Sequence, residues 1–199
     1  MKRAILVRHA ESVLGAAGIA NGDPRVPNPL SPEGEEQARA LAVLLDGTPV
    51  DLCVTSEFER ARETAEIALT GRDVLRLVLP ELNDVRFGRF EGGTLADYRE
   101  WAGANEPTTA APGGGESRAA TITRYVHAYR TVLARSESTI LVVAHGLPIR
   151  YVLNALENRP PEPLVDPVPY AEPYRFSTRE LKAAVSLLEK WGRRPTWLL

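Results

Sequence analysis

Two of the three histidines in this chain stand directly after short apolar segments. His9 follows residues 4–7 with Arg8 between them, and His145 follows residues 139–144. Neutral imidazole is a nucleophile near pH 7, because its unperturbed pKa is about 6.5. A guanidinium fork can bind two oxygens of one phosphate group. Together these residue types indicate chemistry on a phosphoryl group.

A third apolar segment, residues 52–55, leads into a predicted helix that carries Arg60 and Arg62 in its first turns. If the three segments are neighbouring parallel strands, their carboxyl ends meet at one edge of the sheet, where ligands bind in open parallel sheets. Two imidazoles and two or three guanidinium groups would then surround one anion. A histidine that attacks phosphorus forms a phosphohistidine and divides one displacement into two. The arginines would stabilise charge on the transferring oxygens.

A leaving alkoxide needs a proton, and residues 81–93 offer three carboxyl groups that could supply it. Glu81, Asp84 and Glu91 are the candidates, and position in the chain does not choose among them. The same group would donate a proton to the leaving oxygen and then take one from the attacking water. We expect no metal ion and no other cofactor, because arginines and a second imidazole can supply the positive charge.

The segments that must position these residues alternate between strand and helix patterns. Apolar runs predict strands at 4–7, 52–55 and 139–144, with a weaker one at 74–79. Helical spacing of apolar residues follows three start signals, which are Ser31-Pro32, a capping box from Ser56 to Glu59, and Ser177 with Glu180. This alternation predicts an α/β fold with a mostly parallel central sheet, helices on both faces and a small inserted subregion near residues 81–115.

Three stretches rich in proline and glycine interrupt the alternation, at residues 15–29, 103–115 and 157–173. Long loops in a compact domain are often lids or binding loops. None has the composition of a domain boundary, and 199 residues suit one domain, so we expect a single domain over residues 1–199. The pattern does not say whether the proline-rich stretch covers the site or forms an interface.

Composition excludes several classes of protein. With 24 basic and 26 acidic residues the net charge is −2, so a strongly basic nucleic-acid surface is excluded. One cysteine cannot form an internal disulfide framework, and three histidines leave little for a multi-histidine metal site. No segment has the apolar length of a signal peptide or a membrane span. We therefore expect a cytoplasmic protein that binds neither nucleic acid nor membrane; its oligomeric state is not indicated.

Five segments in order match a known set of motifs. They are LVRHAES near the start, PLSPEGEEQA, TSEFERARETAEIA, ELNDVRFGRFEG and VVAHGLPIR. The set resembles the histidine phosphatase superfamily, the group that includes cofactor-dependent phosphoglycerate mutase. The resemblance covers roughly residues 4–156. Each motif alone is weak, but the five in this order are highly specific.

The resemblance implies a role for several residues. His9 would be the nucleophile, and Arg8, Arg60 and His145 would bind the phosphoryl group. The family's acid stands four residues before the glycine of its segment, which places Asp84 in that role, with Glu81 as the fallback.

The chain departs from the family pattern at two positions. The family usually has Glu where Asp84 stands, and many members have Asn where Gly15 stands. Asn21 and Gly22 are expected to supply the missing substrate contact from the loop.

The predicted function is metal-independent hydrolysis of a phosphomonoester through a phosphohistidine on His9. One alternative is a phosphoglycerate-type mutase with the same intermediate, and another is a non-catalytic phosphate-binding regulatory module. The expected partner is a small phosphorylated substrate, and a phosphoprotein is compatible with the same chemistry. The substrate itself depends on loops that match no motif.

Overall fold

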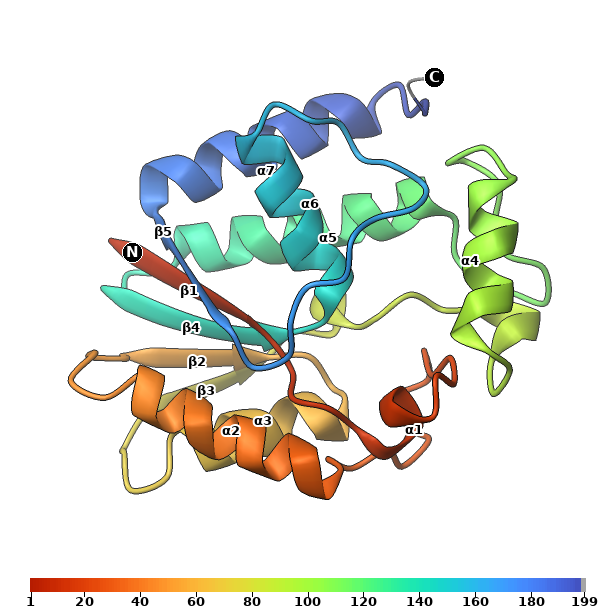
Figure 1. The fold of residues 1–199 in the computed structure, drawn as a ribbon. Coiled ribbons are helices and arrows are strands. Elements are labelled where there is room, and N and C mark those ends of the chain that lie inside the picture. Colours follow the sequence, from red (N-terminus) through yellow and green to blue (C-terminus); the bar gives the residue numbers. More distant parts are fainter. Residues whose placement is uncertain (198–199) are drawn as a thin grey trace.

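The computed structural model describes residues 1–197 and shows a five-stranded sheet between two layers of helices (Figure 1). The strands are β1 (Arg3–Arg8), β2 (Leu52–Thr55), β3 (Leu75–Val78), β4 (Thr139–Ala144) and β5 (Pro173–Ser177). Their order in the sheet is β3-β2-β4-β1-β5. All neighbours are parallel except β5, which runs antiparallel to β1 at one edge. The predicted α/β fold with a mostly parallel sheet is therefore confirmed.

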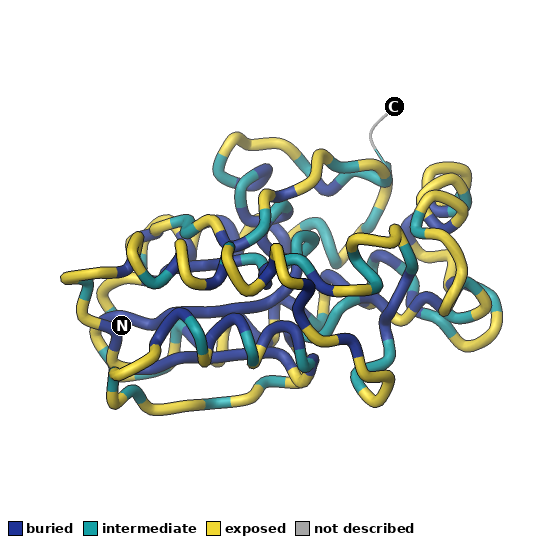
Figure 2. Tube along the Cα trace, turned by 60° about the horizontal axis from the view of Figure 1, so that its bottom comes forward, coloured by how far each residue is buried: buried dark blue, intermediate teal, exposed yellow. Residues whose placement is uncertain are grey.

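Two helical layers bury the two faces of the sheet. One layer is α2 (Pro32–Leu44) and α3 (Glu59–Ala68), and the other is α5 (Arg118–Ala134), α6 (Gly146–Leu156) and α7 (Thr178–Gly192). Side chains alternate along β1, so that Ile5 and Val7 face the first layer and Ala4 and Leu6 face the second. Figure 2 shows the strands buried between helices whose outward sides are exposed. This sandwich fixes the strand ends that carry the candidate residues.

A third, smaller group of elements lies beyond the carboxyl ends of the strands (Figure 1). It contains α1 (Val13–Ala16), the 3₁₀ helices η1 (Pro80–Leu82) and η2 (Gly88–Phe90), and α4 (Leu95–Gly103). Its apolar side chains form a cluster of their own, made of Ala20, Val85, Phe87, Tyr98, Ala102 and Ala111. The inserted subregion expected near residues 81–115 is thus a small group of elements that lies over the carboxyl ends of the strands.

The proline-rich stretch forms what we call the strap, residues 157–172, which connects α6 to β5. Arg150 on α6 holds it, donating to the carbonyl oxygens of Asp166 (2.9 Å) and Pro167 (3.2 Å). Arg8 donates to the carbonyl of Val168 at 2.6 Å, and the Ala171 N–H donates to the Arg8 carbonyl at 2.9 Å. The strap is therefore bound to the end of β1.

Of the two capping boxes predicted from the sequence, one is present and the other is not. The Ser177–Glu180 capping box is present at the start of α7. The predicted Ser56–Glu59 box is wrong, because the cap residue of α3 is Phe58 and no side chain caps that helix. Strand β5 was not predicted, since it follows directly on the proline-rich stretch. No helix among residues 1–197 is long and apolar enough to cross a membrane.

Candidate active site

His9 lies one residue beyond the end of β1 and is almost fully buried. Its backbone N–H donates to the Ala144 carbonyl at 2.8 Å, which ties it to the end of β4. Its ring Nδ1 lies 2.7 Å from the carbonyl oxygen of Ala10. Because a carbonyl only accepts, this contact assigns the ring proton to Nδ1 and leaves a lone pair on Nε2. The ring therefore presents a nucleophilic nitrogen to the site.

Arg60 provides the central cation of the site. It stands in the first turn of α3, and its side chain is 4% exposed. Its Nε–H donates to His9 Nε2 at 3.1 Å, and its Nη1 donates to Asn21 Oδ1 at 2.6 Å. The guanidinium also lies over the ring of Phe58, with 4.1 Å from Cζ to the ring centroid. These contacts fix the plane of the guanidinium beside the nucleophile.

His145 completes the pair of imidazoles, with its ring centroid 5.2 Å from that of His9. It is fully buried at the end of β4, where the backbone turns into α6. Its Nε2 lies 3.0 Å from Ser56 Oγ, and its Nδ1 lies 3.4 Å from Arg60 Nη2. Ser56 is thus engaged by a histidine, which explains why it does not cap α3.

Among the three candidate acids, the structure places Asp84 at the site. Its Oδ2 lies 3.5 Å from Arg60 Nη2 and 3.4 Å from His145 Nδ1. Glu81 is exposed. The Glu91 carboxylate accepts backbone N–H groups of Gly22 (2.9 Å) and Phe87 (3.1 Å), so it joins two loops.

The loop residues predicted to contact substrate differ in what they do. Asn21 is buried and accepts from Arg60, so it holds the guanidinium in place. The Gly22 N–H is used by Glu91 rather than directed at the site. Gly15 lines the same cavity as His9 and Asn21.

Tyr170 is a site residue that the sequence did not indicate. It comes from the strap, and the guanidinium of Arg8 stacks on its ring at 3.7 Å from the centroid. Its ring centroid lies 5.8 Å from that of His9. The sequence left open whether this stretch covers the site or forms an interface, and nothing in it singles out one aromatic residue.

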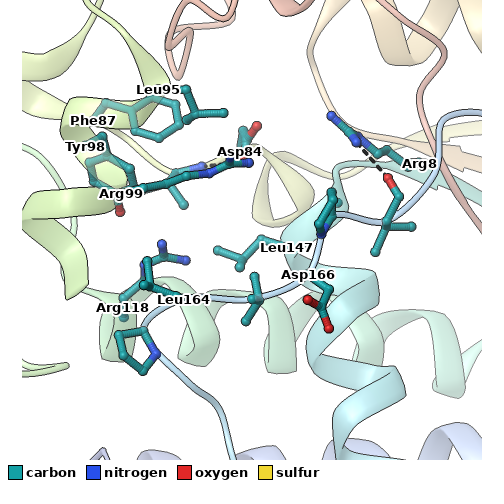
Figure 3. A pocket seen from close by; sticks show the side chains of 16 residues that line it. Arg8, Asp84, Phe87, Leu95, Tyr98, Arg99, Arg118, Leu147, Leu164 and Asp166 are labelled. Atoms are coloured by element: carbon teal, nitrogen blue, oxygen red, sulfur yellow. Dashed lines mark hydrogen bonds between the residues drawn. The ribbon is translucent and has the colours of Figure 1, made fainter.

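These side chains enclose two connected spaces. The inner hollow, about 80 Å³, is lined by His9, Arg60, Asn21 and Tyr170 among others. The outer pocket, about 260 Å³, lies between the inserted subregion, the strap and the start of α6 (Figure 3). Arg8 and Asp84 line both spaces. A ligand can therefore have one group in the hollow and its remainder in the pocket.

Burial and the cluster of positive charge set the protonation of the site. Burial, with the Arg60 guanidinium nearby, holds the pKa of His9 well below its usual value. The same two causes, in the same order, hold the pKa of His145 well below its usual value. Burial lowers the pKa of Arg60 to about 10, so it remains a cation at neutral pH. The empty site thus combines neutral imidazoles with cationic guanidinium groups, which suits an incoming phosphate anion.

Comparison with known sequences identifies a family. A profile described as "Histidine phosphatase superfamily (branch 1)" matches residues 4–188. The chain is similar to the adenosylcobalamin/alpha-ribazole phosphatase of Salmonella typhimurium, with 46% identity over 86 residues. That match covers 43% of this chain and 42% of the relative, less than half the length of either.

Two longer similarities cover most of the chain. It is 30% identical over 173 residues to the 2,3-bisphosphoglycerate-dependent phosphoglycerate mutase 2 of Gloeobacter violaceus, covering 79% of this chain and 77% of that protein. Its fold matches the crystal structure of the alpha-ribazole phosphatase from Shigella flexneri with a TM-score of 0.68 and 32% identity. That match covers 79% of this chain and 81% of the other.

Proposed function

This chain belongs to the histidine phosphatase superfamily, and we propose that it hydrolyses phosphomonoesters through a phosphohistidine formed on His9. The observation that carries the proposal is the state of that imidazole. Its Nδ1 proton is held by the Ala10 carbonyl, so Nε2 carries a lone pair, which accepts the Nε–H of Arg60. A nucleophile beside a fixed cation is the arrangement that phosphoryl transfer requires.

In the first step, Nε2 of His9 attacks phosphorus in line with the leaving oxygen. The N–P bond forms as the P–O bond breaks, and Asp84 gives its carboxyl proton to the leaving oxygen. Arg60 transfers its Nε–H bond from the imidazole to a phosphoryl oxygen, while Arg8 and His145 bind the remaining charge. The Nδ1–H bond to Ala10 stabilises the positive charge that develops on the ring.

In the second step, water attacks the phosphohistidine. The Asp84 carboxylate, left by the first step, takes a proton from that water. The new P–O bond forms, the N–P bond breaks, and His9 regains its lone pair. No step requires a metal ion, because the transferring oxygens face guanidinium and imidazole groups.

The test is hydrolysis of 4-nitrophenyl phosphate by the purified chain in the presence of a chelator. We expect turnover that falls by about 10³-fold or more in His9→Ala, because the nucleophile is lost. His127→Ala is the matched control, since His127 is exposed on α5 and should be dispensable. Turnover that survives in His9→Ala, or that disappears with the chelator, contradicts the proposal.

A mutase is the second candidate, because the Gloeobacter violaceus relative covers most of the chain. A mutase returns its phosphoryl group to a hydroxyl of an acceptor and protects the phosphoenzyme from water. The distinction is whether inorganic phosphate is released without an acceptor. We expect release, since the outer pocket opens directly onto Asp84, which can activate water.

We propose a small phosphorylated metabolite as the substrate, supported by the two relatives named for alpha-ribazole phosphate chemistry. A cytoplasmic location and a single domain remain predictions from the sequence. A phosphate-binding module without turnover is the remaining alternative. Hydrolysis of 4-nitrophenyl phosphate excludes this alternative, and absence of hydrolysis supports it.

A further inference from the structure

Arg118 is a buried cation without an acidic partner in the described part of the chain. The residue is 8% exposed, and no carboxylate among residues 1–197 forms an ion pair with it. Its one hydrogen bond there is a long one, from Nη1 to the hydroxyl of Tyr151 at 3.4 Å. Its Nε is buried and has no partner among residues 1–197. Burying an unpaired charge is costly, so a role outside the stability of the fold is indicated.

The nearest acid along the chain does not compensate for Arg118. Glu116 pairs with Arg124 at 2.8 Å and also lies 3.9 Å from Arg86. Arg118 is in addition the first residue of α5, a helix of 17 residues. The partial positive charge of a helix N-terminus disfavours a cation there and favours an anion. Both the side chain and the helix end therefore lack a negative charge.

The outer pocket offers space for an anion beside Arg118. Arg118 lines this cavity at the end opposite Arg8, with Asp84 between them (Figure 3). Its guanidinium Cζ lies 5.4 Å from the ring centroid of Tyr98. Like Arg118, Arg8 has a buried Nε that no described residue satisfies. The pocket thus has at each end a guanidinium whose Nε has no partner among residues 1–197.

Several apolar side chains line the pocket between these ends. They come from the inserted subregion, from the start of α6 and from the strap, and include Phe87, Leu95, Leu147, Leu164 and Val165. We propose that the substrate is a phosphomonoester whose leaving group has an apolar body and a carboxylate at its far end, bound by Arg118. This proposal rests on the proposed function, because it describes the leaving group of the same reaction.

A carboxylate fits better than a second phosphate group. One buried guanidinium supplies one positive charge, and its fork matches the two oxygens of a carboxylate. The other charged residues that line the pocket outside the catalytic group are Arg99 and Asp166, which are both exposed and carry opposite charges. The net charge left for the leaving group is therefore that of Arg118 alone.

The experiment compares two aryl phosphates that differ only in the far charge. One is 4-(2-carboxyethyl)phenyl phosphate, and the other is its methyl ester, in which the two-carbon spacer keeps the phenol oxygen nearly unchanged. Released phosphate gives kcat/KM for each. We expect the acid to exceed the ester by about tenfold or more, as one charge-assisted hydrogen-bonded pair allows.

Variants assign the preference to the guanidinium. In Arg118→Met the acid-to-ester ratio should fall to about one, and Arg118→Lys should retain part of it. Arg130→Met is the matched control, because it removes an exposed arginine of the same helix that pairs with Glu189. That variant should keep the full ratio.

Thermal unfolding separates this role from a structural one. If Arg118 serves the substrate, Arg118→Met should unfold at the same temperature or higher, since it removes a buried unpaired charge. If instead the bond to Tyr151 is its purpose, the variant should unfold at a lower temperature and keep the acid-to-ester ratio. The second result overturns the proposal.

Other outcomes distinguish failure of this proposal from failure of the proposed function. If the wild type hydrolyses the ester and the acid equally and His9→Ala loses both activities, only the carboxylate site is overturned. A clear preference for the matching 4-(2-phosphonoxyethyl)phenyl phosphate over the carboxylate also overturns it. Turnover of neither substrate, or turnover that survives in His9→Ala, overturns both proposals.

Discussion

The inner hollow and the outer pocket share four lining residues, Arg8, Asp84, Phe87 and Leu95, but differ in how their polar groups are bonded. In the hollow, the Arg60 guanidinium donates to His9 and Asn21, and His145 contacts Ser56. In the pocket, the Nε of Arg118 and the hydroxyl of Tyr98 have no partner among residues 1–197. In the hollow, the nucleophile and the central guanidinium are therefore held in place before any ligand binds, whereas the pocket contains a buried cation, Arg118, that has no acidic partner among residues 1–197.

This difference separates the reaction from its specificity. Groups that stabilise a transition state act best when fixed in advance, because no reorganisation is then needed during the reaction. Groups that select a substrate gain selectivity when they remain unsatisfied without the correct partner. The sheet edge supplies the first kind, and the inserted subregion with the strap supplies the second.

The largest effect expected from this comparison concerns Asp84, which lines both spaces. Asp84→Asn keeps the shape of the side chain but cannot donate the proton, so kcat/KM for an alkyl phosphate should fall by about 10²- to 10³-fold. The fall should be much smaller for 4-nitrophenyl phosphate, because an aryl oxide leaves with less help from a proton. The measurement is kcat/KM on both substrates, which covers the steps up to release of the alcohol.

Glu81→Gln is the control, since Glu81 is the exposed fallback acid. It should change neither rate appreciably. If Glu81→Gln shows the selective loss on alkyl phosphate and Asp84→Asn does not, the acid has been assigned to the wrong carboxyl group. The proton donor would then not be Asp84, the residue that lines both the hollow and the pocket.

The sequence predicts more of the residues of the hollow than of the pocket. His9 and His145 follow short apolar runs that read as buried strands, so their convergence was expected on the condition that these strands are neighbours in a parallel sheet. Tyr170 and Arg118 reach their positions through the strap and the inserted subregion, whose paths depend on tertiary packing. Ser56 was predicted as a helix cap, because local spacing does not show that a distant histidine uses its hydroxyl. Strand β5 was missed because prolines around it hide an edge strand.

The next effect concerns the contact between the loop at Gly22, which borders the hollow, and the inserted subregion, which borders the pocket. A Cβ on Gly22 would lie 2.0 Å from the Val85 carbonyl oxygen and 2.6 Å from Glu91 Oε1. Gly22→Ala should therefore force the loop away from the inserted subregion and lower the free energy of unfolding by about 2–3 kcal/mol. Because the adjacent Asn21 holds Arg60, kcat on 4-nitrophenyl phosphate should fall as well.

The matched control for that variant is Gly103→Ala. A Cβ there would meet only the Leu164 side chain, at ordinary contact distances of 3.5–3.6 Å. The position ends α4, so alanine should leave stability unchanged or raise it slightly. Urea unfolding of both variants measures the contrast. Equal stability of the two would mean that the loop and the insertion are not tightly joined.

The smallest expected effect is the response of the empty hollow to acid. His9 and His145 have pKa values well below their usual value, chiefly because of burial and then because of Arg60. The unfolded chain therefore binds more protons as pH falls below about 6.5, and stability must fall with it. Each histidine contributes at most about 1.4 kcal/mol per pH unit.

Urea unfolding of wild type, His9→Asn and His127→Asn between pH 7.5 and 5.5 measures this contribution. His9→Asn should show a shallower loss of stability with acid than wild type, whereas His127→Asn, which removes the exposed histidine, should follow wild type. The difference between the His9→Asn and wild-type curves then reports the buried imidazole, with His127→Asn as the matched control. Parallel curves for wild type and His9→Asn would mean that the hollow already accommodates a protonated imidazole, and its electrostatic organisation would then be no stricter than that of the pocket.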